Sequence, residues 1–217
     1  MNIFRQLRNL SSIPRLMLLA CVTLACAPAS ARILVHEASA SQGTVIEIFD
    51  TIDYPDATAL SAALDARASR ASGPCSINVW LDSPGGNVDA AMKIGRLLHD
   101  TSSCVRVGRF QRPVSSSNLC ASACVLVLAA GAVRLADASI GIHRPYSVLG
   151  EGTPSGDARC RAAAERIRAY LEEMLMPARL YEEMMRVSAT DVHWLTRDEK
   201  RQLGLHTQDT VALNAGR

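Results

Sequence analysis

Aromatic residues are scarce in this chain of 217 residues, where Phe, Trp and Tyr together make up only 4%. Alanine is plentiful by contrast, and this balance favours helices that pack closely on a sheet through small side chains. A strong charge of either sign is also lacking, because the formal net charge is only +2. We therefore expect neither nucleic acid nor an acidic surface as a partner.

Long apolar runs and metal-ligand spacings are missing beyond the N-terminal region. No segment after residue 31 reaches the roughly 20 apolar residues that a spanning helix needs, so we expect no stable membrane span in the mature chain. Cys120 and Cys124 form a C-x-x-x-C pair, but no second ligand pair with suitable spacing accompanies it. The sequence therefore predicts no metal and no cofactor.

Residues 1–31 have the pattern of a signal peptide. Three arginines precede an apolar stretch over residues 16–27, and Ala29-Ser30-Ala31 forms a small-x-small cleavage site. The apolar stretch is too short to span a membrane as a stable helix. We expect an exported, soluble mature protein, periplasmic or secreted, and a lipoprotein anchored at Cys21 or Cys26 is the weaker alternative.

Strands and helices are expected to alternate along the mature chain. After a flexible start over residues 32–42, apolar strands are expected at 43–52, 75–81 and 104–108, with helices at 56–70 and 88–100 between them. Near-continuous apolar strands joined by helices predict a parallel α/β sheet with right-handed crossovers. Short strands at 133–135 and 139–143, an exposed loop at 146–157 and helices at 158–176, 178–187 and 196–203 complete the expected elements.

A serine and a histidine with catalytic potential lie in the stretch from residue 119 to residue 145. Ala121-Ser122-Ala123 opens an apolar run with the length of a short buried helix, and His143 follows a short strand. A serine where a loop enters a helix can present its hydroxyl beside backbone N–H groups that are free to bind an anion. A later histidine could supply its general base. The structural alternative makes Ser122 a helix cap and His143 a strand-end residue.

Ser83-Pro84-Gly85-Gly86 follows a buried strand, at the end of the sheet where ligands collect in parallel α/β folds. Two glycines let the chain turn sharply and expose backbone N–H groups beside a helix start. An oxyanion hole requires such donors. A plain Pro-Gly turn is the structural alternative for these residues.

The order of these blocks resembles the Clp proteolytic-subunit family of serine peptidases. The blocks are L-D-S-P-G-G-N-V-D-A-A-M-K-I, A-S-A at the head of an apolar helix, G-I-H-R-P, and W-L-T-R-D-E-K-R-Q-L-G-L near the C-terminus. The resemblance covers about residues 43–205. It implies a ClpP/crotonase-like fold of ββα repeats in one domain over 43–217: a mainly parallel sheet flanked by helices, with the long helix at 158–176 used for assembly.

The resemblance also implies the roles of the site residues. Ser122 would be the nucleophile of a serine-type endopeptidase, and His143 would be its general base. The backbone N–H groups of Gly86 and Ala123 would form the oxyanion hole. The loop at 146–157 would lie where the substrate strand of the family pairs.

The acid of the triad departs from the family pattern. An ungapped alignment of the last block puts Ser188 where the family has Asp, and Asp191 lies three residues further along the chain. Asp191 is the candidate acid, while a Ser–His dyad with water or Ser188 orienting the ring is the alternative. Loss of the acid would leave a slow enzyme, because the acid holds the imidazole tautomer.

Two further departures concern an extra loop and the cysteines. Residues 110–118 form an insertion that we expect to cover or narrow the site. Five cysteines remain after the leader, an odd number that leaves at least one free thiol in an oxidising compartment. Cys75 and Cys104 begin neighbouring strands, so we expect a bridge between them. A bridge from Cys120 or Cys124 to Cys160 is a second, weaker expectation.

The leading functional hypothesis is an exported, homo-oligomeric serine peptidase that hydrolyses peptides or unfolded segments. It would act without an ATP-driven unfoldase, because ATP is not supplied outside the cytoplasm. A catalytically weakened or inactive scaffold with a binding or assembly role is the alternative that Ser188 motivates. Acyl-thioester chemistry of the crotonase branch is a third hypothesis, but it relies on cytoplasmic acyl-CoA and does not call for a Ser–His pair.

Overall fold

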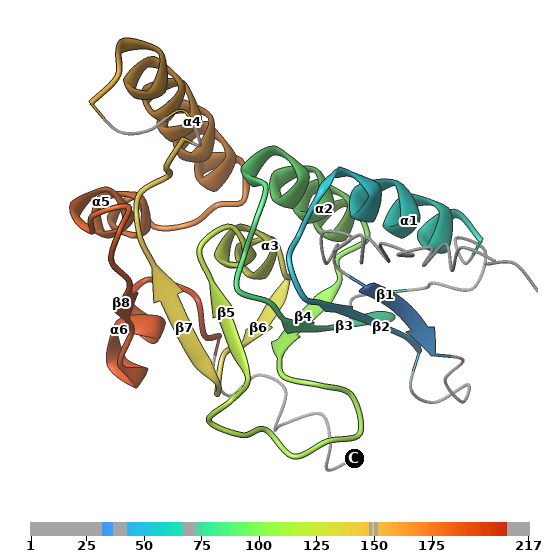
Figure 1. The fold of residues 1–217 in the computed structure, drawn as a ribbon. Helices are drawn as coiled ribbons and strands as arrows, with labels where there is room; N and C mark the ends of the chain where they lie inside the picture. The colour runs from blue at the N-terminus through green and yellow to red at the C-terminus, as the bar shows by residue number, and fades with distance from the viewer. Residues whose placement is uncertain are drawn as a thin grey trace, which may run out of the picture.

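The computed structural model describes residues 32–36, 43–66, 73, 75–147, 149 and 152–207 (Figure 1). The expected leader over residues 1–31 lies outside these ranges. The strands are β1 (Arg32–His36), β2 (Thr44–Phe49), β3 (Ile77–Asp82), β4 (Cys104–Val107), β5 (Leu119–Ala121), β6 (Val133–Leu135), β7 (Ser139–Ile142) and β8 (His193–Trp194). The helices are α1 (Tyr54–Asp65), α2 (Val88–Asp100), α3 (Cys124–Ala129), α4 (Pro154–Glu173), α5 (Ala178–Arg186) and α6 (Arg197–Gln202).

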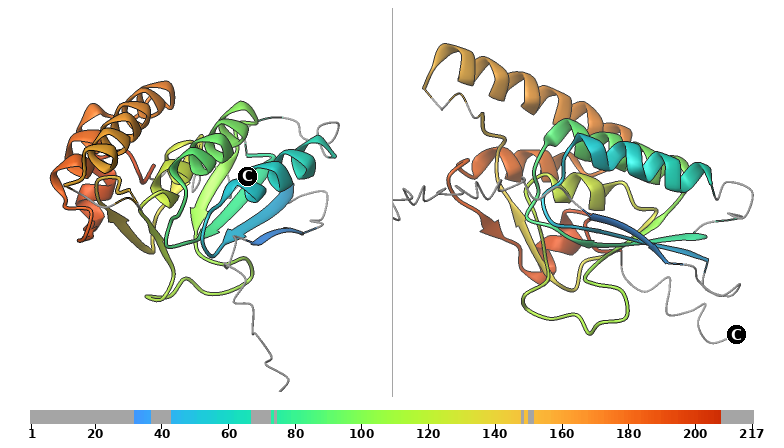
Figure 2. Two further views of the ribbon diagram at one scale, coloured as in Figure 1. Left: turned by 45° about the horizontal axis from the view of Figure 1, so that its top comes forward. Right: turned by 45° about the vertical axis from the view of Figure 1, so that its right-hand side comes forward.

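The larger sheet has the strand order β1-β2-β3-β4-β6. Its strands β2, β3, β4 and β6 pair in parallel, and only β1 is antiparallel to its neighbour. Helices α1, α2 and α3 lie over the same face of this sheet (Figures 1 and 2). The predicted α/β architecture with a mainly parallel sheet and flanking helices is therefore confirmed.

Alternation along β3 shows why the helices cover only one face. Ile77, Val79 and Leu81 are fully buried, whereas Asn78 and Trp80 on the opposite side remain partly exposed. Strand side chains alternate between the two faces, so the apolar set faces the helices and the mixed set faces away.

A smaller sheet carries the segments of greatest functional interest. Its strand order is β5-β7-β8, with β5 and β7 parallel and β8 antiparallel to β7. Ser83, just after β3, connects the two sheets: its N–H donates to Leu119 O at 2.9 Å and its carbonyl accepts from Ala121 N at 3.1 Å. The carboxyl ends of β3, β5 and β7 consequently lie near one another.

The long helix α4 runs alongside α2 and in the same direction. Arg166 Nε lies 3.0 Å from Asp89 Oδ1, and Arg96 Nη2 lies 2.7 Å from Glu173 Oε2. In both ion pairs the α4 residue stands 77 positions after its α2 partner, so the two helices are in register. Beyond this contact the start of α4 projects away from the sheets (Figures 1 and 2).

The flexible start predicted for residues 32–42 is wrong for its first five residues. These residues form β1, in which Arg32 pairs with Phe49 and His36 with Val45 along the edge of β2. The His36 ring also lies 2.9 Å from the buried carboxylate of Glu47. Residues 37–42 lie outside the described residues. Pairing with β2 supplies the order, and the pattern of the five residues alone carries little signal of such pairing.

Two helices begin earlier than the sequence suggests. Asp53, not Asp56, is the N-cap of α1, and Asp56 instead accepts from the N–H of Asp53 to complete a capping box. Helix α4 begins at Pro154, where the sequence predicts a loop, and Thr153 caps it by accepting from Gly156 N at 3.0 Å. Proline fits the first helical turn, because its missing N–H would be unpaired there anyway.

Two disulfides are present among the described residues. Cys75–Cys104 ties the segment before β3 to the start of β4, as predicted. A closed loop of about 30 residues gives a stabilisation of about 3–4 kcal/mol in the chain-entropy model. The second bridge joins Cys120 to Cys124 and leaves Cys160 as a free thiol, so the expected bridge to Cys160 is wrong.

No helix in the described part of the chain combines the length and the apolar character that crossing a membrane requires.

Candidate active site

Ser122 occupies a sharp turn between the end of β5 and the start of α3. Its φ is +55°, in the left-handed region that residues with a Cβ rarely adopt and that costs about 1–2 kcal/mol. The Ser122 N–H donates to Gly141 O at 2.9 Å, and its carbonyl accepts from Val125 N at 3.0 Å. Such a strained strand-to-helix turn is a geometry that presents a nucleophilic hydroxyl at the end of a sheet.

The glycine bend, Gly85 and Gly86, lies directly against this turn. A Cβ placed on Gly85 would be 2.7 Å from the Cβ of Ser122 and 2.9 Å from the nitrogen of Ala123. Gly86 has a φ of +138°, and a Cβ there would overlap the carbonyl oxygen of Ile52. Only glycine allows this approach, so the two motifs that are distant in sequence meet in space.

Two backbone amides at this meeting point have no acceptor. The bend is held by its neighbours: Ile52 N donates to Gly85 O at 2.7 Å, and Asn87 N donates to Ile52 O at 2.8 Å. Within the described residues, the N–H groups of Gly86 and Ala123 donate to nothing. Free amides beside a nucleophile can bind the oxygen of a tetrahedral intermediate.

His143 follows β7 and is only 9% exposed. Its Nδ1 lies 2.7 Å from the carbonyl oxygen of Arg144, and the Arg144 N–H donates to Val187 O at 3.2 Å. A carbonyl oxygen can only accept a hydrogen bond, so Nδ1 carries the proton in this contact. In the neutral ring this tautomer leaves the lone pair of Nε2 free, as a general base requires.

One cavity of about 620 Å³ brings these groups together. Ser122, His143 and Gly86 all line it. Helix α4 forms the opposite wall with Arg159, Ala162, Ala163 and Arg166, and the Asp89–Arg166 ion pair joins α2 to that wall. Serine, imidazole and a glycine bend therefore share a space large enough for a peptide segment.

Asp191 does not reach this cavity in the structure. It is exposed, its carboxylate accepts from Val192 N at 2.8 Å, and its N–H donates to Ser188 O at 3.1 Å. Ser188 Oγ lies 3.0 Å from Thr190 Oγ1. Among the residues that the structure describes, the His143 ring has only the Arg144 carbonyl as a hydrogen-bond partner. The role of Asp191 as the triad acid stays a prediction.

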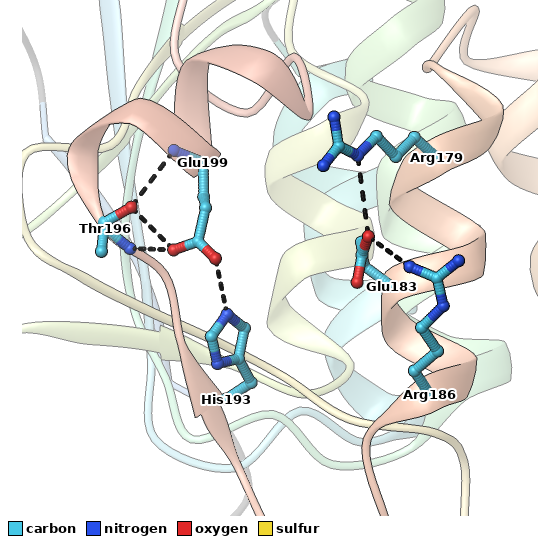
Figure 3. Close-up of polar contacts among 6 residues, drawn as sticks. All are labelled: Arg179, Glu183, Arg186, His193, Thr196 and Glu199. Carbon is cyan, nitrogen blue, oxygen red and sulfur yellow. Dashed lines mark hydrogen bonds and ion pairs between the residues drawn. The ribbon is translucent and has the colours of Figure 1, made fainter.

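Polar clusters flank the segment that carries Asp191 on both sides in the sequence (Figure 3). After it, His193 Nε2 lies 2.9 Å from Glu199 Oε1, and Glu199 completes a capping box with Thr196 at the start of α6. Hydrogen bonds from Thr196 and His193 lower the pKa of Glu199 to about 2. Before it, an ion-pair cluster on α5 joins Arg179, Glu183 and Arg186.

Asp82 was not singled out as a site residue from the sequence, although it positions the turn. Its carboxylate accepts from Leu119 N and from Asn118 Nδ2, each at 3.1 Å, and so fixes the start of β5 beside β3. Ser83 Oγ accepts from Gly85 N at 3.1 Å and shapes the glycine bend. The sequence signal that could have identified both residues is their place, an acidic residue and a serine directly before the Pro-Gly-Gly turn.

The insertion at residues 110–118 does not cover the site, contrary to the expectation from its length. It precedes β5, whereas Ser122 follows β5, and Figure 1 draws it below the sheets and away from α2 and α4. Among the described residues, the insertion contributes none that line the cavity with Ser122. Phe110 packs edge-on against Trp80 instead, with ring centroids 6.1 Å apart.

Comparison with known proteins identifies the fold. The sequence matches no protein-family model, and a comparison with curated proteins gives no match. A ClpP1 mutant from Listeria monocytogenes superposes with a TM-score of 0.55 at 19% identity, covering 78% of this chain and 94% of that one. A serine-to-alanine mutant of the 1510-N membrane-bound stomatin-specific protease gives 0.55 at 20% identity, covering 77% and 80%. The fold is therefore ClpP-like.

Proposed function

We propose that this protein is an exported serine endopeptidase that hydrolyses peptide bonds through Ser122 and His143. One observation carries the proposal: Ser122, at a left-handed φ, shares a single cavity with His143 and with a glycine bend whose amide is free. The ClpP-like fold supports it, because one of the solved structures with this fold is described as a protease.

The proposed chemistry follows from the protonation state and the free amides. His143 Nε2 takes the proton of Ser122 Oγ as that oxygen attacks the peptide carbonyl carbon. The N–H groups of Gly86 and Ala123 then hold the negative oxygen of the tetrahedral intermediate, each donor being worth about 3–4 kcal/mol in the transition state. His143 returns the proton to the leaving amine, and water, activated by the same imidazole, hydrolyses the acyl-enzyme.

The disulfides support the exported location, because such bridges persist in oxidising compartments. Peptides or unfolded segments are the proposed substrates, cleaved without an ATP-driven unfoldase. Homo-oligomeric assembly through α4 belongs to the same proposal, and the projecting start of this helix supports it (Figure 2).

Fluorophosphonate labelling of the full chain tests the function. The protein is produced with export in a bacterial host so that its disulfides form, and labelled peptides are identified by mass spectrometry. We expect a single adduct on Ser122, which Ser122→Ala abolishes. Ser147 lines the same cavity, so Ser147→Ala is the matched control and should label like the wild type. A folded protein without any adduct would favour the alternative of a binding or assembly scaffold.

The Asp191→Asn variant decides which group orients the imidazole. We expect its rate of labelling at Ser122 to stay within about threefold of the wild type, because the Arg144 carbonyl already holds the tautomer that a base needs. The measurement is the second-order rate constant for the fluorophosphonate. A loss of about 100-fold or more would instead identify Asp191 as the acid of a triad that forms during turnover.

A further inference from the structure

The Cys120–Cys124 disulfide closes around the turn that carries Ser122. Cys120 is the middle residue of β5, and Cys124 is the first residue of α3. Their Cα atoms are 5.3 Å apart, and Ser122 is the central residue of the five that the bridge encloses. Both cysteines are fully buried, so the bridge fastens the turn from the core side.

Backbone hydrogen bonds from Ser122 and the Asp82 carboxylate also hold this turn, but no side chain caps the helix that follows it. Helix α3 has only six residues, and Ala123 at its N-cap provides no side-chain hydrogen bond. Helices this short have little stability of their own, and an uncapped start lets the first turn fray. Ser122 must nevertheless keep a φ of +55°, a conformation that an unrestrained residue with a Cβ leaves readily.

We propose that Cys120 and Cys124 are a positioning pair for the catalytic turn. Their bridge holds the Ser122 hydroxyl toward His143 and keeps the Ala123 amide aimed at the oxyanion position. This inference rests on the proposed peptidase function, and it assigns the bridge a role in the reaction rate beyond its place in the hydrophobic core. A misplacement of about 1 Å in reacting groups can cost about 100-fold in rate, so a small loosening of this turn has a measurable effect.

The other disulfide supplies a matched control. Cys75–Cys104 encloses a much longer stretch of chain, and neither of its cysteines lines the cavity with Ser122. Removing it costs stability through the unfolded state, without touching the turn. Loss of a bridge that only stabilises the fold therefore lowers stability without changing the labelling rate of the folded protein. Loss of a bridge that positions Ser122 lowers both.

The test compares the double variants C120A/C124A and C75A/C104A in the full chain. For each, the thermal midpoint of unfolding and the second-order rate constant for fluorophosphonate labelling of Ser122 are measured. We expect both variants to unfold at lower temperature. Only C120A/C124A should label more slowly, by about tenfold to 100-fold, whereas C75A/C104A stays within about twofold. With a peptide substrate, C120A/C124A should lower kcat and leave KM nearly unchanged.

A second measurement keeps the test valid if C120A/C124A does not fold. The C75A/C104A protein holds Cys120–Cys124 as its one disulfide among the described cysteines. Dithiothreitol gives this bridge two electrons and two protons, which yields two thiols, and the dithiol itself becomes a cyclic disulfide. We expect labelling to slow on reduction and to recover on reoxidation of the same sample.

The possible failures are distinguishable. Wild-type labelling rates in folded C120A/C124A, or in the reduced protein, overturn the positioning role and leave the peptidase proposal intact. The positioning role is also overturned if labelling slows in both double variants in proportion to their loss of thermal stability. No labelling of the folded wild type refutes the peptidase function and the positioning role together.

Discussion

Replacing His143 with alanine is expected to slow fluorophosphonate labelling of Ser122 by about 1,000-fold or more. A serine hydroxyl is a weak nucleophile at neutral pH and depends on a base within reach of its proton. His143 lines the cavity with Ser122, and its Nδ1 contact with the Arg144 carbonyl makes Nε2 the nitrogen that accepts a proton in the neutral ring. The second-order rate constant for labelling is the direct measurement.

The His193→Ala variant is the matched control for this prediction. His193 lies on the short strand β8 and is exposed, and its Nε2 is within hydrogen-bond distance of Glu199 Oε1, at 2.9 Å. We expect its labelling rate to stay within about twofold of the wild type, because exposed polar contacts of this kind contribute little to stability and neither His193 nor Glu199 lines the cavity with Ser122. Undiminished labelling of a folded His143→Ala protein would rule out the imidazole as the base.

The Gly95→Ala variant is expected to lose about 3 kcal/mol of unfolding free energy. A Cβ on Gly95 in α2 would overlap the hydroxyl of Tyr170 in α4. Tyr170 has no exposed surface, and its hydroxyl donates to Leu126 O at 2.8 Å. Burial raises the pKa of Tyr170, so it remains a donor throughout the pH range of the experiment. Urea unfolding at neutral pH measures the loss.

The double variant G95A/Y170F identifies the cause of that loss. Removing the hydroxyl vacates the position that the new methyl group needs, so we expect the double variant to be more stable than Gly95→Ala alone. Tyr170→Phe by itself should cost about 1 kcal/mol, the value of one buried hydrogen bond. Equal stability of Gly95→Ala and the wild type would mean that α2 and α4 separate more easily than their packing indicates.

Much of the fold could be predicted because its signals are local. The segments that form β2, β3 and β4 are short and largely apolar, and β2 and β3 are each followed by a helix with a recognisable start or stop. The Ser122 turn and the glycine bend could also be predicted from the sequence. Small residues at those positions have a physical purpose, which is the close approach of Gly85 to the Cβ of Ser122.

Features that depend on which partner a segment or side chain takes could not be predicted. Strand β1 exists because it pairs with β2, and nothing in R-I-L-V-H distinguishes it from an extended tail. The cysteine pattern C-x-x-x-C is compatible with a bridge, with free thiols or with other partners, so Cys120–Cys124 needed coordinates. The acceptor of His143 Nδ1 is a backbone carbonyl. A search of the sequence for carboxylates does not find such a partner, because every residue has a backbone carbonyl.

The left-handed backbone at position 122 also bears on how the protein is best converted into a reagent for capturing its substrates. An inert variant must lose the hydroxyl and still fold around a bound peptide. Alanine removes the oxygen but keeps a Cβ, and with it the cost of about 1–2 kcal/mol that L residues bear in this region. Glycine adopts a φ of +55° without that cost. Ser122→Gly is therefore the replacement of choice for trapping, and valine or threonine is the poorest.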